Sequence, residues 1–151
     1  MDKRATKRLW RIKGRLTLAP ILAYPDETKT FLLFTDASDL ALGAILSQLD
    51  SEGREQVISY ASRSLSPAEK NYSVTEKECL AVVWAVSHYR QYLHGAPFNL
   101  YTDHVALKSL FSHKLPQNRL ARWILTLQEY SFTTIHKAGK VHRNADSISR
   151  I

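Results

Sequence analysis

The amino-acid order predicts an α/β domain in which helices pack against one mixed β-sheet. Three short apolar segments follow one another with short links, which favours antiparallel strands. Two later strand-like segments alternate with segments of helical period, which favours parallel strands joined by helices. The expected order is β-β-β-α-β-α-α-β-α, with three antiparallel strands followed by parallel ones.

The first half of this order comes from three strand-like segments. Phe31–Thr35 is a short apolar run rich in aromatic residues, as in a buried strand. Leu42–Leu49 and Gln56–Ala61 are two further strand candidates. Asp50–Gly53 lies between them and has the composition of a hairpin turn.

Residues 74–93 give the strongest helix signal in the chain. Ser73 with Glu76, or Thr75 with Glu78, would form a capping box at its start, and both pairings fit the spacing. The apolar side chains that recur at three- and four-residue spacings are Val82, Val83, Val86, Tyr89, Tyr92 and Leu93.

Five shorter elements complete the predicted domain. Phe98–Thr102 and Phe132–His136 have the composition of short strands. Val105–Phe111 and Arg119–Tyr130 have helical periodicity, and Ala145–Arg150 begins a last helix.

Composition excludes several classes of protein. A length of 151 residues suits one domain with a single core. One cysteine, Cys79, excludes an internal disulfide framework and a cysteine-based zinc site. The longest uncharged apolar run, Cys79–Val86, is too short to span a membrane. Pro20 interrupts the apolar stretch that follows the basic start, which argues against a signal peptide. We therefore expect an intracellular protein that is neither secreted nor bound to a membrane.

The net charge of +7 is unevenly distributed along the chain. Residues 1–15 contain seven Lys or Arg residues against one Asp, a pattern compatible with a short amphipathic helix or a solvated tail. Residues 16–107 contain six basic and eleven acidic residues. Residues 108–151 contain eight basic and two acidic residues. An acidic centre able to hold cations thus lies between basic flanks able to meet a polyanion.

Four carboxylates stand at the ends of predicted elements. Asp36 follows the first strand, Asp103 follows the fourth strand, Glu78 lies near the start of the long helix and Asp146 near the start of the last one. Such positions meet at the ligand crevice of an open α/β sheet, and a carboxylate cluster suits Mg²⁺. Each acid also has a purely structural explanation as a turn or helix cap.

The sequence around these acids resembles the ribonuclease H domain of reverse transcriptases from gypsy-class LTR retrotransposons. The resemblance covers roughly residues 16–151 in unbroken order. The segments that carry it most distinctly are Phe34–Ser38, Ser59–Leu65, Tyr72–Val83, Tyr101–His104, Arg119–Trp123 and Ala145–Arg150.

This resemblance implies a ribonuclease H-like fold with a five-stranded mixed sheet, and metal-dependent cleavage of the RNA strand in RNA–DNA hybrids during reverse transcription. It places the metal ligands and catalytic acids on Asp36, Glu78, Asp103 and Asp146. Two Mg²⁺ ions, for which Mn²⁺ can substitute, would activate water and stabilise the leaving oxyanion. Asp36 would bridge both ions.

Further residues follow from the same resemblance. Glu76 competes with Glu78, but two residues along a helix is about 200° of rotation, so both cannot face one site, and the motif position favours Glu78. A loop histidine often precedes the last acid in relatives, and His136 and His142 are the candidates for that catalytic role. The candidate contacts with nucleic acid are Ser38, Arg119, Arg122, Lys137, Lys140 and Arg143.

The resemblance also suggests how the chain is organised. Residues 1–25 would be a basic remnant of the linker to the polymerase domain, and residues 26–151 the ribonuclease H domain. The protein would act in a cytoplasmic virus-like particle or in the nucleus. Two alternatives stay open: a catalytically inactive nucleic-acid-binding module with the same fold, and an integrase-like nuclease or strand transferase.

Overall fold

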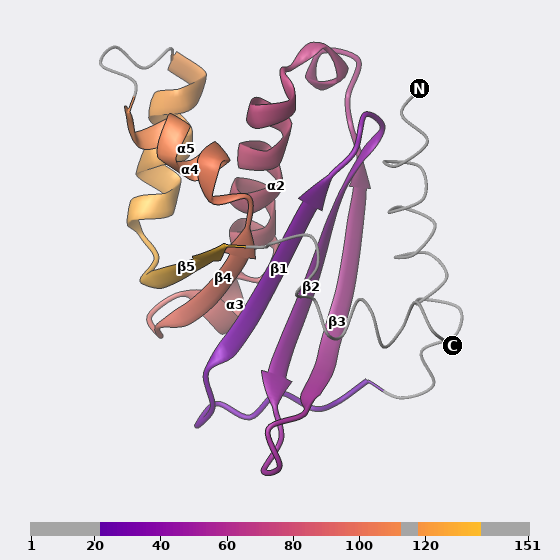
Figure 1. The fold of residues 1–151 in the computed structure, drawn as a ribbon, viewed down its shortest axis with the longest axis vertical. Coiled ribbons are helices and arrows are strands. Elements are labelled where there is room, and N and C mark those ends of the chain that lie inside the picture. The colour runs from indigo at the N-terminus through magenta and orange to yellow at the C-terminus, as the bar shows by residue number, and fades with distance from the viewer. Residues whose placement is uncertain (1–21, 113–117, 137–151) are drawn as a thin grey trace.

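A computed structural model of the chain describes residues 22–112 and 118–136. These residues form one five-stranded sheet with the strand order β3-β2-β1-β4-β5 (Figure 1). The pairs β1–β2 and β2–β3 are antiparallel, and the pairs β1–β4 and β4–β5 are parallel, as predicted. The strands are β1 (Phe31–Ala37), β2 (Ala41–Leu49), β3 (Glu55–Ser64), β4 (Phe98–Thr102) and β5 (Phe132–His136).

Helices pack against this sheet, and Figure 1 shows α2 beside β1, with α4 and α5 on the side of α2 away from β2 and β3. Helix α2 packs on β1 and β2, and it also contacts α4 and α5. The helices expected within residues 3–15 and at Ala145–Arg150 lie outside the described residues. The described helices are η1 (Glu69–Asn71, a 3-10 turn), α2 (Val74–His88), α3 (Arg90–Leu93), α4 (His104–Ser112) and α5 (Asn118–Gln128).

The long helix predicted over residues 74–93 is interrupted at Tyr89. There the backbone leaves helical geometry, with φ −100° and ψ 22°. The Tyr89 ring is buried in the core, and its hydroxyl donates a hydrogen bond to Ser59 of β3 at 3.1 Å. Apolar periodicity continues through the break into α3, which is why the sequence pattern did not reveal it.

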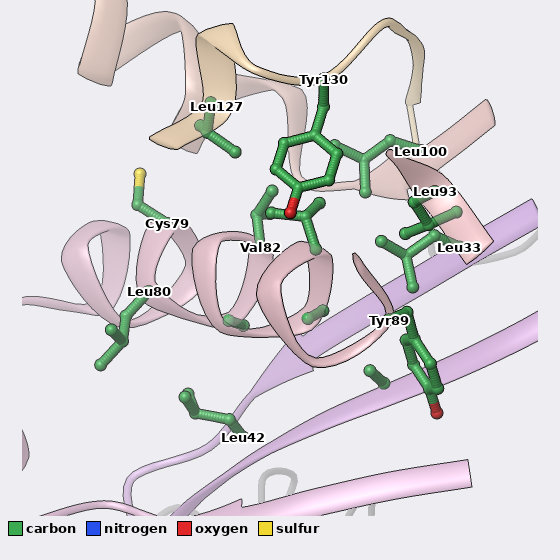
Figure 2. Packing of buried hydrophobic residues seen from close by; sticks show 14 of the residues in the cluster. Leu33, Leu42, Cys79, Leu80, Val82, Tyr89, Leu93, Leu100, Leu127 and Tyr130 are labelled. Carbon is green, nitrogen blue, oxygen red and sulfur yellow. The ribbon is translucent and has the colours of Figure 1, made fainter. Parts of the chain in front are cut away.

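The core lies between the sheet and the helices. Leu33, Val82 and Leu100 are fully buried, and burying one such side chain contributes about 1.5–3 kcal/mol. In Figure 2, Leu80 of α2 and Leu42 of β2 point toward one another across the layer between helix and sheet. This packing fixes α2 against the central strands, so side chains near the start of α2 are held in place relative to the sheet.

The two ends of the sheet differ in character. The turn 38–41 joins β1 to β2 at the carboxyl end of β1, where α2 and α4 also begin (Figure 1). The hairpin turn 50–54 lies at the opposite end, and its Gly53 has φ +78°, which L side chains rarely adopt. The carboxyl ends of β1 and β4 therefore lie at the same edge of the sheet, where Asp36 and Asp103 are found. Within the described ranges, no helix combines the length and apolarity that a membrane span requires.

Candidate functional site

Asp36 lies in β1, and Asp103 directly follows the neighbouring parallel strand β4. Phe34 pairs with Tyr101 in the register of β1 and β4, so the residues two positions further on, Asp36 and Asp103, lie at the same level. Adjacent strands are about 4.8 Å apart. Asp36 is half-buried, and its Oδ1 accepts a hydrogen bond from the Ala37 amide at 3.1 Å. Two of the four predicted acids are thus brought together at one edge.

Asp103 has a structural role as well. It immediately precedes α4, and its Oδ1 accepts a hydrogen bond from the Val105 amide at 2.9 Å. The helix cap anticipated from the sequence is therefore present. A carboxylate offers about four lone-pair sites, so capping with one oxygen is compatible with binding a cation. The Asp103 side chain is exposed at the surface, where a ligand can reach it.

Glu76 is the glutamate of the capping box. Its amide donates to Ser73 Oγ at 3.1 Å, and its Oε2 accepts from the Ser73 amide at 3.0 Å. Its Oε1 lies 3.2 Å from Nη2 of Arg119 in α5. Both carboxylate oxygens thus hold the start of α2 and join it to α5. Of the two boxes that the sequence allowed, the Ser73–Glu76 box forms.

Glu78 lies two residues further along α2 and is almost buried, with 9% of its surface exposed. Its two chain neighbours contact the two segments that carry the other acids. Lys77 Nζ lies 3.3 Å from Oδ1 of Asp39, three residues after Asp36. The Cys79 thiol donates to the Ala106 carbonyl at 3.0 Å, three residues after Asp103. Glu78 is therefore anchored between the Asp36 and Asp103 segments.

The acids near Cys79 affect the pKa of its thiol. Burial raises the pKa of the Cys79 thiol to about 12, and the negative charges of Glu78, Glu76 and Asp103 act in the same direction. Carboxylates that act together on one buried group create a negative potential that a divalent cation would offset.

The donor set suits a hard cation such as Mg²⁺, because all three described acids offer carboxylate oxygens. Asp146, the fourth predicted acid, lies outside the described residues. Among the residues that the structure describes, no three His, Cys, Asp or Glu side chains are grouped closely enough to hold a metal ion. Mg²⁺ commonly takes one or two carboxylates and keeps several waters, so an open arrangement of this kind fits it.

The two candidate histidines are placed unequally. His136 is the last residue of β5, pairs in register with Thr102 and is exposed. It therefore ends its strand beside the start of the Asp103 segment. His142 lies outside the described residues.

The predicted nucleic-acid contacts divide into three groups. The Ser38 hydroxyl accepts from the amides of Leu40 and Ala41 and donates to the Ala41 carbonyl, which uses its hydrogen-bonding capacity within the turn. Arg119 stacks on the Tyr72 ring, 3.9 Å from its centroid, besides pairing with α2. Arg122 is exposed on α5. Lys137, Lys140 and Arg143 lie outside the described residues.

Lys77 and Asp39 are residues that the sequence reasoning did not single out. They are 38 positions apart, and no spacing rule connects a helix residue with a turn residue at that distance. The only available signal was a lysine directly beside Glu78 at the start of an apolar helical run.

Comparison with solved structures identifies the class of fold. The chain is similar to LC11-RNase H1, isolated from compost by a metagenomic approach, with TM-score 0.54 and 12% identity over 80% of this chain and 92% of that chain. It is also similar to the foamy viral protease-reverse transcriptase solved in complex with an RNA/DNA hybrid, with TM-score 0.62 and 19% identity over 96% of this chain and 20% of that one. The fold is thus ribonuclease H-like.

Sequence comparison then gives the family. Residues 26–130 match the RNase H-like domain found in reverse transcriptase, and the chain belongs to this family. It is 42% identical to the retrovirus-related Pol polyprotein from transposon opus of Drosophila melanogaster, over 100% of this chain and 15% of that protein. It is 45% identical to the polyprotein from transposon 297 of the same organism, over 93% and 13% respectively. The chain thus spans under one sixth of the length of these relatives.

Proposed function

We propose that this domain is a metal-dependent endonuclease that cleaves the RNA strand of RNA–DNA hybrids during reverse transcription. One observation carries the proposal: the two chain neighbours of Glu78 contact the segments that directly follow Asp36 and Asp103. Acids carried by three neighbouring segments would repel one another without a cation, which favours a metal-binding role. A structurally similar foamy viral reverse transcriptase was solved with an RNA/DNA hybrid, which supports the choice of substrate.

In this proposal the acids divide between two Mg²⁺ ions, for which Mn²⁺ can substitute. Asp36 would be the shared ligand, Glu78 and Asp103 would complete one site, and Asp146 would complete the other. Bound ions of this kind supply an activated water and neutralise charge on the leaving oxygen. His136 and His142 are the side chains that could carry a proton to or from the product at neutral pH.

The protein's own basic side chains would hold the hybrid. Exposed Arg122 is a candidate for phosphate contact, with Lys137, Lys140 and Arg143 following β5 in the chain. Contacts to 2′-hydroxyl groups would distinguish RNA from DNA, and phosphate contacts would make the affinity depend on salt. The polymerase domain of the parent polyprotein would be the protein partner, inside a virus-like particle or the nucleus.

The test is cleavage of a strand-labelled RNA–DNA hybrid by the full 151-residue chain with Mg²⁺, compared with single-stranded RNA and duplex DNA. We expect cleavage of the RNA strand in the hybrid only, and its loss in Asp36→Asn. Glu52→Gln is the matched control, because Glu52 is an exposed carboxylate in the hairpin turn at the opposite end of the sheet.

The alternatives give different results in the same assay. Hybrid binding without cleavage, and without metal uptake, would establish the inactive binding module instead. Cleavage or strand transfer on duplex DNA would establish the integrase-like alternative. Asp36→Asn cleaving as fast as the unmodified chain would place the activity elsewhere.

A further inference from the structure

We propose that Lys77 is a positioning residue whose ion pair with Asp39 sets the separation between Asp36 and Glu78, and thereby the affinity of the site for its metal. The inference rests on the proposed function, since it assumes that Asp36 and Glu78 bind metal. It extends that function to a lysine and an aspartate that themselves touch neither metal nor substrate.

The burial of Lys77 is the first observation. Only 9% of its side chain is exposed, whereas 50% of its partner Asp39 is exposed. A lysine on a helix normally extends its ammonium group into water, because burying an ammonium ion is costly unless it is paired. The Lys77 side chain instead runs to the β1–β2 turn, and its Nζ lies 3.3 Å from Asp39 Oδ1.

The turn that receives Lys77 is rigid. Ser38 Oγ accepts hydrogen bonds from the Leu40 and Ala41 amides at 3.2 and 3.0 Å. The Leu40 carbonyl in turn accepts from the Leu65 amide at 2.9 Å, which joins the turn to the end of β3. Because the turn is held on both sides, the position of Asp39 is coupled to that of Asp36, three residues earlier in the same hairpin.

Lys77 and Cys79 are the direct chain neighbours of Glu78 in α2, so their contacts restrain its position. Lys77 is the residue directly before Glu78, and a helix transmits position rigidly from one residue to the next. The Cys79–Ala106 hydrogen bond holds the other side of Glu78 to the Asp103 segment. Without Lys77, the first turns of α2 around Glu78 would keep the Cys79 hydrogen bond to the Asp103 segment. They would lose the ion pair with the Asp36 hairpin.

The experiment measures metal binding separately from catalysis. Mn²⁺ binding to the full chain is followed by electron paramagnetic resonance without nucleic acid, and thermal unfolding is measured without metal. We expect Lys77→Met and Asp39→Asn each to weaken Mn²⁺ binding about tenfold, in the range seen when groups that orient metal ligands are removed. The double variant should be no weaker than either single variant, since both remove the same interaction.

Two controls separate positioning from general destabilisation. Lys77→Arg keeps the ion pair and should restore most of the affinity. Glu129→Gln breaks the exposed Arg90–Glu129 pair, whose atoms lie 2.8 Å apart and which belongs to none of the segments that carry Asp36, Glu78 and Asp103, and should leave Mn²⁺ binding unchanged. If Lys77→Met fails to fold, Asp39→Asn tests the inference instead. The Asp39 side chain is half exposed to solvent, so replacing it leaves no buried group in place of the carboxylate.

The outcomes distinguish this inference from the proposed function. Lower thermal stability of Asp39→Asn and Lys77→Met with unchanged Mn²⁺ affinity would show a merely structural ion pair and overturn the inference alone. An unmodified chain that binds no Mn²⁺ and cleaves no hybrid would overturn the proposed function, and the inference with it.

Discussion

The thiol of Cys79 in α2 donates a hydrogen bond to the backbone carbonyl of Ala106 in α4, with 3.0 Å between Sγ and the oxygen. This contact joins the two helices one residue after Glu78 and three residues after Asp103. A buried cysteine is usually a small apolar residue, but here it also connects two acid-bearing segments.

Cys79 should react very slowly with thiol reagents in the folded protein. Burial and the neighbouring carboxylates raise the pKa of its thiol to about 12, and only the thiolate is nucleophilic. At about pH 8 the thiolate fraction is then about 1,000-fold below that of a free cysteine. Labelling with Ellman's reagent in native buffer, against urea-unfolded protein as control, measures this ratio. Comparable rates in both states would contradict it.

Replacing the two glutamates of α2 should separate catalysis from helix capping. Glu78→Gln should lower hybrid cleavage by at least about 100-fold with little change in thermal stability, since it weakens a proposed metal ligand. Glu76→Gln should keep cleavage within a few-fold and lower the free energy of unfolding by about 1 kcal/mol, because it weakens the capping box and the pair with Arg119. The opposite pattern would assign the catalytic role to Glu76.

The ion pair that precedes α2 should make stability depend on pH. Arg63 donates hydrogen bonds to Glu69 at 2.8 and 3.0 Å and lowers the pKa of Glu69 from 4.5 to about 2. A lowered folded-state pKa means that the stabilisation is complete above pH 4.5 and is lost as the pH falls toward 2.

Glu69→Gln should therefore lower the free energy of unfolding by about 1–2 kcal/mol at neutral pH, after allowance for solvent screening, and by less at about pH 3. Urea unfolding of both proteins across this range measures the difference. Equal destabilisation at both pH values would show that the charge of Glu69 is not responsible.

The two arginines of α5 should behave differently. Arg119→Ala should lower thermal stability, because it removes the stacking on Tyr72 and the pair with Glu76. Arg122→Ala should leave stability nearly unchanged and reduce the slope of log affinity for hybrid against log salt by about 1, as for one lost phosphate contact. Fluorescence anisotropy at several salt concentrations gives the slope. An unchanged slope would remove Arg122 from the interface.

The amino-terminal boundary of the domain can be tested through Gln48, which is buried in β2. Its Oε1 accepts from the Asp26 amide at 2.9 Å, and its Nε2 donates to the carbonyls of Asp26 and Lys29 at 2.7 and 3.1 Å. The start of the domain at residue 26 stays a prediction, and the Ala23 amide also donates to the Val57 carbonyl of β3 at 2.8 Å. Gln48→Ala should destabilise the protein by about 1–3 kcal/mol and make residues 26–30 sensitive to protease. Resistance to protease in the variant would contradict this boundary.

Much of the fold could be predicted from the sequence, because local residue patterns determine most of its strands and turns. Short apolar runs joined by short links predicted the antiparallel strands, and Phe98–Thr102 and Phe132–His136 were predicted with the observed bounds. The family followed from the segments around the acids. The break at Tyr89 was missed, because it depends on a tyrosine packing across the sheet to Ser59 rather than on local periodicity.

The arrangement of the candidate site could be predicted less fully from the sequence, because tertiary contacts determine it. Ser73 and Thr75 each have a glutamate three residues later, so the sequence allowed two capping boxes. Only the position of Arg119, brought close by tertiary packing, shows why Glu76 is used for capping. The Lys77–Asp39 pair likewise arises from packing of a helix on a hairpin, which no residue pattern encodes. The proposed roles of Asp146 and His142 stay predictions.

The position of β1 in the middle of the sheet has a consequence for the order of folding. Strands β1 to β3 pair with near neighbours in the chain, whereas Phe31 of β1 meets its partner Phe98 in β4 only after a long loop has closed. Long-range closure of this kind is the slow part of folding. The hairpin carrying Asp36 can therefore form well before Asp103 joins it, and the proposed nuclease activity would appear only when that late pairing is complete.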